Sequence, residues 1–413
     1  MRILFANHTG SWSGAEVSLL RVVEGLRKAH EVTVACPGNG PLREALEQSG
    51  VRWVPLPTVD VSLRPHPRHT PVGLAQLRNA GAALARAARD CEAQVVHANT
   101  PRTGLMGAVA RRFGAPPIVV RAHEHLPLTP IGRSARSVIV RTAASVAAVS
   151  DYTAERFNAG LPRAVATRVY NSIDHSRFRA GQVRPAGLRA TLGLREEALL
   201  LGQIAQITPW KGQDTSIRAL AQLRRDGLDA HLVLVGTIVF GGRAVRHDNH
   251  GFRRLLEELV DELQVREAVH FLGQRSDVAE ILADLDLSLV PSWEEPFGLV
   301  TVESLAMGTT PLVSAVGAGP ELVQDRWNGR VLDPHRPAAW AAAARELLAD
   351  ERERARLAER GPAAAARFTD AAHAREMLEL YASAASAPVK RRSRRHGRLA
   401  ARRADQGSVA PPA

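Results

Sequence analysis

Two glutamates in the C-terminal half are the residues best suited to chemistry. Glu295 and Glu303 lie eight residues apart in PSWEEPFGLVTVESLAMGTTPLVS, which spans residues 291–314. The pattern predicts a buried strand, a loop that contains Gly298, and a helix whose second turn carries Glu303. Two carboxylates placed in this way can bracket a polyhydroxylated ligand by accepting hydrogen bonds from sugar or ribose hydroxyls.

The start of that helix is a candidate anion site. Gly298 allows the backbone to approach a ligand closely. The first N–H groups of a helix have no carbonyl partner within the helix, and the helix dipole favours negative charge at that end. The sequence therefore predicts a site that suits a diphosphate, formed by Phe297, Gly298, Leu299 and Val300.

The segment EPFGLVTVE, which contains both glutamates, resembles the E-x7-E signature of retaining glycosyltransferases with the GT-B fold, specifically glycosyltransferase family 4. Two glutamates at this spacing often occur by chance, but further segments match the same family in the same order over residues 1–385. The resemblance implies that Glu295 orients a transferred sugar and that Glu303 binds the ribose of a nucleotide-sugar donor.

A second matching segment is GQIAQITPWKGQDTSIRAL, at residues 202–220. Lys211 and Gly212 match the Lys-Gly pair of the family, and a lysine ammonium is a compact cation suited to the donor diphosphate. Gln206 stands where the family usually has arginine. Glutamine can donate a hydrogen bond but carries no charge, so it stays open how the second phosphate charge is neutralised.

Three other segments resemble parts of the family near the donor. In VHFLGQRSDV, backbone groups near Phe271 and Leu272 are expected to hold the base. In GSWSGAEVSLL, Gly14 belongs to a glycine-rich loop expected to close on the donor phosphate. In SAVGAGPELVQ, the turn at residues 317–319 is expected to bring N–H groups near the ligand, and Glu321 is expected to be structural.

The segment RAHEHLP ends a predicted strand with two histidines and a glutamate. His123 matches the histidine that the family places in its cleft, where a neutral imidazole is expected to donate a hydrogen bond to a sugar hydroxyl. His125 is the less favoured alternative. A metal site would combine these histidines with His97 and Glu124, but it lacks the usual ligand spacing and any match in the family. We therefore expect no metal and no cofactor.

Near-continuous apolar runs alternate with amphipathic segments along both halves of the chain. This alternation is typical of βαβ units with helices on both faces of a parallel sheet, and 413 residues exceed what one core usually supports. The predicted fold class is α/β, with the GT-B arrangement of two Rossmann-like domains whose parallel sheets face a cleft. The predicted strands are Arg2–Asn7, Glu31–Cys36, Val51–Leu56, Gln94–Ala98, Pro117–His123, Ser145–Ser150, Leu199–Ala205, His231–Val235, Val269–Leu272, Leu285–Pro291 and Thr310–Ala315.

The predicted domains are an acceptor-side domain at residues 1–180 and a nucleotide-sugar-binding domain at residues 188–365. Residues 366–386 are expected to form a helix that crosses back to the N-terminal domain, and residues 387–413 a basic disordered tail. The segment RVYNSID resembles the end of the first domain in the family, with Ser172 in place of glycine. A turn that required positive φ at this position would be strained.

Positive charge is concentrated at the two ends of the chain. Residues 1–180 carry 23 Lys and Arg against 12 Asp and Glu, residues 181–387 carry 23 against 29, and residues 388–413 carry 8 against 1. The basic first half suits an anionic membrane surface or an anionic acceptor. Nucleic acid is an unlikely partner because no nucleic-acid motif occurs and aromatic residues make up only 4%. A compositional bias towards arginine, without a ligand, is the simple alternative.

The location of the protein follows from what its sequence does not contain. No apolar window reaches the ~20 residues of a membrane span, and the N-terminus has no apolar stretch of signal-peptide length. The two cysteines, Cys36 and Cys91, imply no disulfide framework. We expect a cytoplasmic protein, with a peripheral position at the inner face of the cell membrane as an option.

The resemblance implies a retaining, metal-independent transferase, for instance in cell-envelope polysaccharide synthesis. It would move a sugar from a UDP-, GDP- or similar nucleotide-sugar to a glycan, lipid-linked or small-molecule acceptor. Lys211 would bind the diphosphate, and His123 would contact the sugar or the acceptor. The competing hypotheses are a non-catalytic nucleotide-sugar-binding scaffold with the same fold and a nucleic-acid-binding protein that uses the basic tail.

Overall fold

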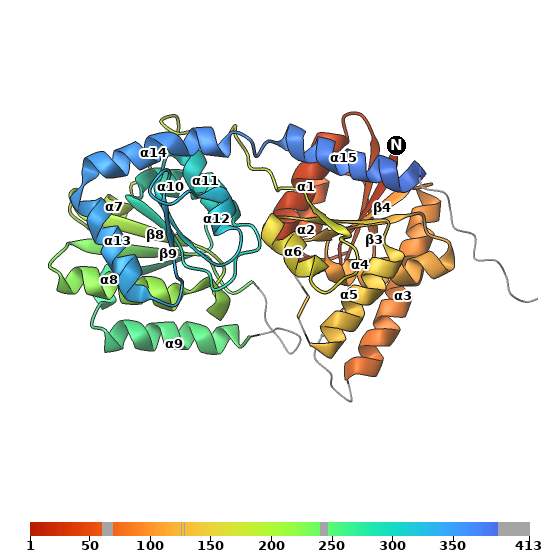
Figure 1. Ribbon diagram of the computed structural model, residues 1–413, viewed down its shortest axis with the longest axis horizontal. Coiled ribbons are helices and arrows are strands. Elements are labelled where there is room, and N and C mark those ends of the chain that lie inside the picture. The colour runs from red at the N-terminus through yellow and green to blue at the C-terminus, as the bar shows by residue number, and fades with distance from the viewer. Residues whose placement is uncertain (60–68, 125, 128, 240–246, 387–413) are drawn as a thin grey trace, which may run out of the picture.

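The computed structural model describes residues 1–59, 69–124, 126–127, 129–239 and 247–386. The chain forms two parallel β-sheets that lie side by side, each flanked by helices (Figure 1). The predicted α/β class with two Rossmann-like units is confirmed. Two predictions, for His125 and for the tail at residues 387–413, concern positions outside the described residues.

The N-terminal sheet has seven parallel strands in the order β3-β2-β1-β4-β5-β6-β7. The strands are β1 (Arg2–Ala6), β2 (Glu31–Cys36), β3 (Trp53–Pro55), β4 (Val95–Ala98), β5 (Ile118–Ala122), β6 (Ser145–Ala148) and β7 (Ala166–Arg168). The helices are α1 (Gly14–Leu26), α2 (Pro41–Gln48), α3 (His69–Asp90), α4 (Pro101–Ala110), the 3₁₀ turn η1 (Arg111–Phe113), α5 (Pro130–Thr142) and α6 (Asp151–Asn158).

The C-terminal sheet has six parallel strands in the order β10-β9-β8-β11-β12-β13. The strands are β8 (Leu199–Ile204), β9 (Ala230–Val235), β10 (Val269–Gly273), β11 (Leu287–Val290), β12 (Pro311–Ser314) and β13 (Arg330–Leu332). The helical elements are α7 (Leu188–Thr191), η2 (Pro209–Lys211), α8 (Gln213–Arg225), α9 (Asn249–Glu262), η3 (Arg266–Ala268), α10 (Val278–Asp284), α11 (Leu299–Met307), α12 (Gly319–Leu322), α13 (Pro337–Ala349), α14 (Glu351–Ala365) and α15 (Asp370–Ser386).

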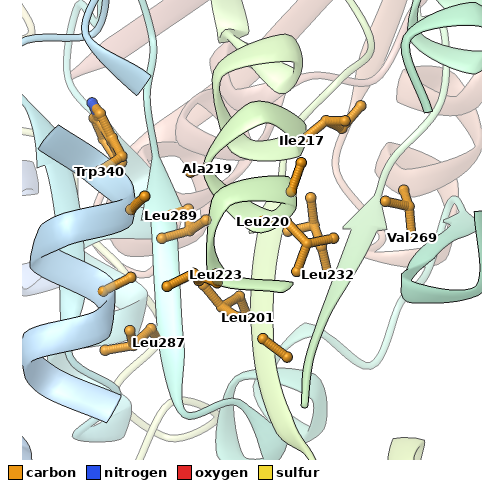
Figure 2. Packing of buried hydrophobic residues seen from close by; sticks show 14 of the residues in the cluster. Leu201, Ile217, Ala219, Leu220, Leu223, Leu232, Val269, Leu287, Leu289 and Trp340 are labelled. Carbon is orange, nitrogen blue, oxygen red and sulfur yellow. The ribbon is translucent and has the colours of Figure 1, made fainter. Parts of the chain in front are cut away.

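Both faces of the C-terminal sheet are buried, which explains why its strands are apolar at nearly every position. On β8, Leu201 belongs to the core beneath α8 and α13, whereas Leu200 belongs to the core on the other face. Figure 2 shows Leu220 and Leu223 of α8 above Leu201, with Trp340 of α13 beside them. The fully buried Trp340 donates its indole N–H to the carbonyl oxygen of Asp333 at 2.9 Å, so its one polar group is satisfied.

The last helix packs on the N-terminal half of the molecule. Figure 1 shows the chain running from α14, over the C-terminal sheet, to α15, over the N-terminal sheet. Helix α15 contacts α1 and strands β4 to β6, and its buried Met377 and Tyr381 share a core with Phe5 of β1. Among the described ranges, no helix combines the length and apolar character that crossing a membrane requires.

The segment that precedes the second sheet does not need the expected glycine. Among the described residues, positive φ in residues other than glycine occurs at Glu92, Gln264 and Arg326, and Ser172 is not one of them. Ser172 is buried instead, with its Oγ 3.4 Å from Nδ1 of His373 on α15. Serine at this position therefore introduces no backbone strain.

The two halves meet at the N-terminus of α6. Ser150 and Thr153 donate their hydroxyls to the carbonyl oxygen of Pro296, at 2.5 Å and 3.2 Å. The Glu321 carboxylate of α12 accepts the backbone N–H groups of Asp151 and Tyr152 at 2.9 Å and 2.7 Å. A carboxylate from one half thus caps a helix of the other, where both the free N–H groups and the helix dipole favour negative charge.

Replacing Glu321 tests this contact. Glu321→Ala removes the acceptor for two N–H groups and is expected to lower the free energy of unfolding by about 1 kcal/mol, as for loss of a helix cap. We also expect a larger radius of gyration in small-angle X-ray scattering, because the halves separate more readily. Glu321→Gln keeps one acceptor oxygen. Its unfolding free energy and its radius of gyration should therefore lie between those of the wild type and those of Glu321→Ala. Unchanged stability and scattering in the alanine variant would contradict the capping role.

Candidate active site

A cavity of about 790 Å³ lies between the two halves. Its wall is built from the loops after β1, β4 and β5 of the first sheet and after β8 and β11 of the second, so it lies at the carboxyl ends of parallel strands, where open α/β sheets bind ligands. Of the predicted site residues, the wall contains Gly14, His123, Gln206, Lys211, Glu295, Phe297, Gly298, Leu299, Val300 and Glu303.

Phe271 and Leu272, predicted beside the base, are not part of this wall. The Arg253 guanidinium of α9 lies over the Phe271 ring, 3.6 Å from its centroid. Leu272 packs against the core on the opposite face of the sheet. Both side chains on the edge strand β10 therefore cover the sheet, and the expectation that backbone groups near them hold the base stays a prediction.

Lys211 and Glu295 form an ion pair at the centre of the site. Nζ of Lys211 lies 2.6 Å from Oε2 of Glu295, and Ser292 donates its hydroxyl to the same oxygen at 2.8 Å. The side chains are only 16% and 9% exposed, so both charges are largely removed from bulk water. Nζ also lies 4.2 Å from the centroid of the Trp210 ring, a cation–π contact. The pair joins the loop after β8 to the loop after β11.

Two glycines hold the loops that carry this pair. Gly317 has φ of 100°, and a Cβ there would lie 2.2 Å from the carbonyl oxygen of Glu295, which accepts the N–H of Ala318 at 2.8 Å. Gly212 has φ of 67°, and a Cβ there would lie 2.2 Å from the carbonyl oxygen of Pro291. The turn at 317–319 is not part of the cavity wall. In this structure the turn supports the backbone of Glu295, and its approach to a ligand stays a prediction.

The N-terminus of α11 faces the cavity as the sequence predicts. The N–H groups of Thr301 and Val302 bond to the carbonyl oxygen of Gly298. Leu299 and Val300, the first two helical residues, precede those that can bond within the helix, and both line the cavity. This end of the helix can bind an anion through backbone N–H groups.

Glu303 is half-buried in the cavity wall. Burial raises the pKa of its carboxyl to about 7, against the opposing effects of the Arg177 and Arg21 guanidinium groups. Arg21 itself lies 3.5 Å from Asp370 and 3.7 Å from Asp174. The protonation state of Glu303 therefore changes close to neutral pH.

Gln206 lines the cavity without bringing a positive charge. Its backbone carbonyl accepts a hydrogen bond from the Gln213 side chain at 2.9 Å, which fixes the loop. Of the lysine and arginine side chains that the structure describes, Lys211 and Arg102 line the cavity. Arg102 lies 3.7 Å from Glu124. Among the C-terminal residues that the structure describes, no second cation beside Lys211 lines the cavity in place of the missing arginine at position 206.

His123 contributes to the wall from the loop after β5. Its Nε2 lies 3.2 Å from Oδ1 of Asn99. Burial, followed by the Arg121 guanidinium, holds the pKa of His123 well below its usual value, so the ring is neutral. In the part of the chain that the structure describes, no cluster of three or more potential metal ligands is found.

Sequence reasoning missed three polar residues that the cavity region brings together. Asn7 and Asn99 are the first residues after β1 and β4, and Asn7 donates its amide N–H to Oε1 of Glu16 at 3.0 Å. Glu16 also accepts the N–H and hydroxyl of Ser13, which forms a capping box at the start of α1. Two signals could have revealed them: the S-x-x-E spacing of the box, and a polar residue directly after each of two apolar strands.

Two family models match successive parts of the chain. Residues 12–177 match the model "Glycosyltransferase Family 4", and residues 187–364 match "Glycosyl transferases group 1". The boundary between the two matches lies in the segment that connects the last strand of the first sheet to the first strand of the second sheet. Together the matches cover most of the described residues.

Among curated relatives, the D-inositol 3-phosphate glycosyltransferase of Stackebrandtia nassauensis is 37% identical over 198 residues, 48% of this chain and 44% of the relative. The enzyme of that name from Mycobacterium marinum is 31% identical over 271 residues, 62% of this chain and 55% of the relative. The matches thus span about half the length of these relatives.

Among solved structures, Anabaena HepE in complex with UDP-glucose superposes with a TM-score of 0.80 at 26% identity, over 93% of this chain and 100% of HepE. Sucrose-phosphate synthase from Thermosynechococcus elongatus superposes with a TM-score of 0.75 at 21% identity, over 92% and 98% of the two chains, and shows likeness of fold alone.

The support of Glu295 by Gly317 can be tested with a matched glycine. Gly114 has a similar φ of 84°, but a Cβ at this position would meet nothing within 4 Å. Gly114→Ala should therefore lose about 1–2 kcal/mol of unfolding free energy from the backbone alone. Gly317→Ala should lose clearly more, because the methyl group also displaces the Glu295 backbone. Equal losses in urea unfolding would show that the close approach at Gly317 has no energetic weight.

Proposed function

The chain belongs to the family 4 glycosyltransferases with the GT-B fold, and on that premise we propose that it transfers a sugar from a nucleotide-sugar donor to a hydroxyl acceptor with retention of anomeric configuration. The observation that carries the proposal is the arrangement around Glu295. One cavity brings together the Lys211–Glu295 ion pair, the N-terminus of α11 and the half-buried Glu303. These groups supply a cation, backbone N–H donors and two carboxylates for a diphosphate joined to two polyhydroxylated rings.

The donor diphosphate is proposed to lie between Lys211 and the N-terminus of α11. A lysine ammonium has three N–H donors. Lys211 can therefore keep its bond to Glu295 and still donate to a phosphate oxygen. The N–H groups of Leu299 and Val300 lie in the same wall and favour negative charge. With Gln206 uncharged, these N–H groups carry more of the interaction with the second phosphate, and Gly14 approaches it from the N-terminal half.

Glu295 and Glu303 are proposed to hold the two ends of the donor. Glu303 accepts hydrogen bonds from the ribose hydroxyls, and Glu295 orients the transferred sugar from its fixed place beside Ser292. In the reaction, the bond from the anomeric carbon to the diphosphate breaks and a bond to the acceptor oxygen forms on the same face. The acceptor proton passes to the leaving diphosphate, whose growing charge Lys211 and the α11 N–H groups stabilise.

The comparisons suggest which substrates to test first. HepE has been solved with UDP-glucose, so UDP-sugars are the first donors, followed by GDP-sugars. The curated relatives are named for D-inositol 3-phosphate, which makes that compound the first small-molecule acceptor, beside glycan and lipid-linked acceptors. The surplus of 23 Lys and Arg over 12 Asp and Glu in residues 1–180 suits an anionic acceptor or an anionic membrane surface.

A non-catalytic nucleotide-sugar-binding scaffold is the second candidate, and Gln206 is the observation that favours it. Without the expected arginine, less charge is available to stabilise the leaving diphosphate than in a site with two cations. The two candidates differ in one measurable respect. A scaffold would bind nucleotide-sugars without turnover or hydrolysis, whereas a transferase turns them over.

We expect the protein to transfer glucose from UDP-glucose to D-inositol 3-phosphate and form an α-glucoside, which NMR of the anomeric proton identifies. The rate in excess EDTA should equal the rate without EDTA.

The variant Lys211→Met should lower kcat/KM roughly 100-fold, the usual effect of removing one group that stabilises developing charge. A panel of UDP- and GDP-sugars that neither raises the melting temperature nor turns over would contradict the proposal.

The control for Lys211→Met must separate catalysis from stability, because the single change leaves a buried carboxylate without its cation. The double variant Lys211→Met, Glu295→Gln removes both charges and should recover much of the lost stability. Its activity should fall well below that of Glu295→Gln alone, which keeps the Lys211 ammonium. Equal activity in the double variant and in Glu295→Gln would mean that Lys211 acts only as a structural partner of Glu295.

Donor affinity should depend on pH through Glu303. Its pKa of about 7 means that the carboxyl is protonated below this pH and ionised above it, and the ionised form is the better acceptor for two ribose hydroxyls. The Kd for UDP-glucose should therefore rise roughly tenfold from pH 8 to pH 6, measured by calorimetry. Glu303→Gln should bind more weakly at pH 8 and show no such slope. The same slope in both proteins would exclude Glu303 as its source.

A further inference from the structure

A chain of hydrogen bonds leads from the start of α1 to His123 beneath the cavity. Asn7, Asn99 and His123 are the first residues after β1, β4 and β5, which are neighbours in the sheet. Asn99 donates its amide N–H to Oδ1 of Asn7 at 3.1 Å, and its own Oδ1 lies 3.2 Å from Nε2 of His123. Asn7 and Asn99 are completely buried, at 0% and 1% exposure, so water does not compete for these bonds.

The direction of every bond in the chain is set by two backbone carbonyls. The amide nitrogen of Asn7 donates to the carbonyl oxygen of Thr9 at 2.8 Å, and that of Asn99 donates to the carbonyl oxygen of Ala15 at 3.3 Å. A carbonyl oxygen can only accept. Exchanging the amide nitrogen and oxygen of Asn7 or Asn99 would therefore place the amide oxygen against the carbonyl oxygen of Thr9 or Ala15. Both orientations hold whether or not Glu16, the other acceptor for Asn7, is ionised.

Both histidines beside Asn99 must consequently donate to its oxygen. Nε2 of His97 lies 3.4 Å from Oδ1 of Asn99, and Nδ1 of His97 lies 2.7 Å from the hydroxyl oxygen of Tyr381 on α15. If Nε2 carries the single proton of neutral His97, Nδ1 accepts, and Tyr381 donates. The fold thus places the proton of each ring on Nε2.

Both rings are neutral, so each has one nitrogen without a proton. Burial lowers the pKa of His97 to about 3 and holds that of His123 well below its usual value, and the buried Arg121 guanidinium acts in the same direction on both. Arg121 donates to Oδ1 of Asn171 at 2.7 Å and cannot itself accept a proton from the histidines. Nδ1 of His123 has no hydrogen-bond partner among the described residues, while the ring lines the cavity.

We propose that Asn7 and Asn99 are positioning residues that hold His123 with its proton on Nε2, so that Nδ1 accepts a hydrogen bond from a substrate hydroxyl in the cavity. This reverses the sequence expectation that the imidazole donates to a sugar hydroxyl. The inference rests on the proposed function only for its last step, the contact with substrate. The tautomer itself is a property of the free protein.

The first test reads the tautomer directly. Protein with ¹⁵N-labelled histidine is examined by long-range ¹H–¹⁵N correlation NMR at pH 7.5, and the His123 signals are identified by their loss in His123→Gln. We expect a protonated Nε2 and an unprotonated Nδ1. Asn99→Ala should shift His123 towards a mixture of tautomers. Tyr381→Phe is the matched control: it should alter the His97 signals and leave the His123 tautomer unchanged. A protonated Nδ1 in the wild type would overturn the inference.

The second test asks whether Nδ1 accepts from substrate. UDP-glucose analogues in which one hydroxyl at a time is replaced by hydrogen or by fluorine are compared as donors. At the position that meets His123, both replacements should lower kcat/KM about tenfold, because neither can donate. In His123→Ala, the analogues modified at that position should have the same kcat/KM as UDP-glucose, whereas analogues modified elsewhere should keep their loss of kcat/KM. A fluoro analogue that keeps the activity lost by the deoxy analogue would show that His123 donates and would overturn the inference.

The two proposals fail in different ways. If no nucleotide-sugar is turned over but NMR shows the proton on Nε2, the tautomer stands and the transferase function fails. If turnover is normal but the proton is on Nδ1, the transferase function stands and the positioning role of Asn7 and Asn99 fails.

Discussion

The cleft depends above all on the buried ion pair between Lys211 and Glu295. β8 and β11 are neighbours in the sheet, so the loops that carry the two residues leave the same edge side by side. Removing two charges from water is unfavourable unless their geometry is good and their other bonding positions are filled. The hydroxyl of Ser292 fills one further bonding position of the Glu295 carboxylate, and the close approaches at Gly212 and Gly317 fix the backbone of the two loops.

The same pair determines how charge is distributed in the cavity. Lys211 is already compensated by Glu295, and Arg102 lies near Glu124, while Glu16, Glu294 and Glu303 also line the wall. Among the described residues of the wall, carboxylates therefore outnumber cations. An anion at the proposed diphosphate position would interact with helix N–H groups, whose partial charges are fixed in direction and need no counter-ion.

The sequence was sufficient for the fold class and for most of the wall, because both depend on local pattern. Apolar strands alternate with helices, and the strand–loop–helix around Glu295 carries its own turn and helix start. The short strands β7 and β13 escaped prediction because each contains an arginine and neither forms an apolar run. The sequence also could not show that Phe271 packs under Arg253 or that the 317–319 turn supports Glu295, because both contacts involve segments distant in the chain. The row of Asn7, Asn99 and His123 likewise needs the order of strands in the sheet, which single strands do not reveal.

The contact between the halves has a consequence for how the site responds to ligand. Ser150 and Thr153 hold the carbonyl of Pro296, and that residue is joined by one peptide bond to Glu295. The N-terminus of α6 is thus linked to the backbone of Glu295 through one residue. By thermodynamic reciprocity, a ligand that favours this contact makes the contact between the halves more stable. The formed contact then raises the affinity for the ligand by the same factor. The effect of ligand on the contact and the effect of the contact on ligand affinity would then report the same coupling free energy.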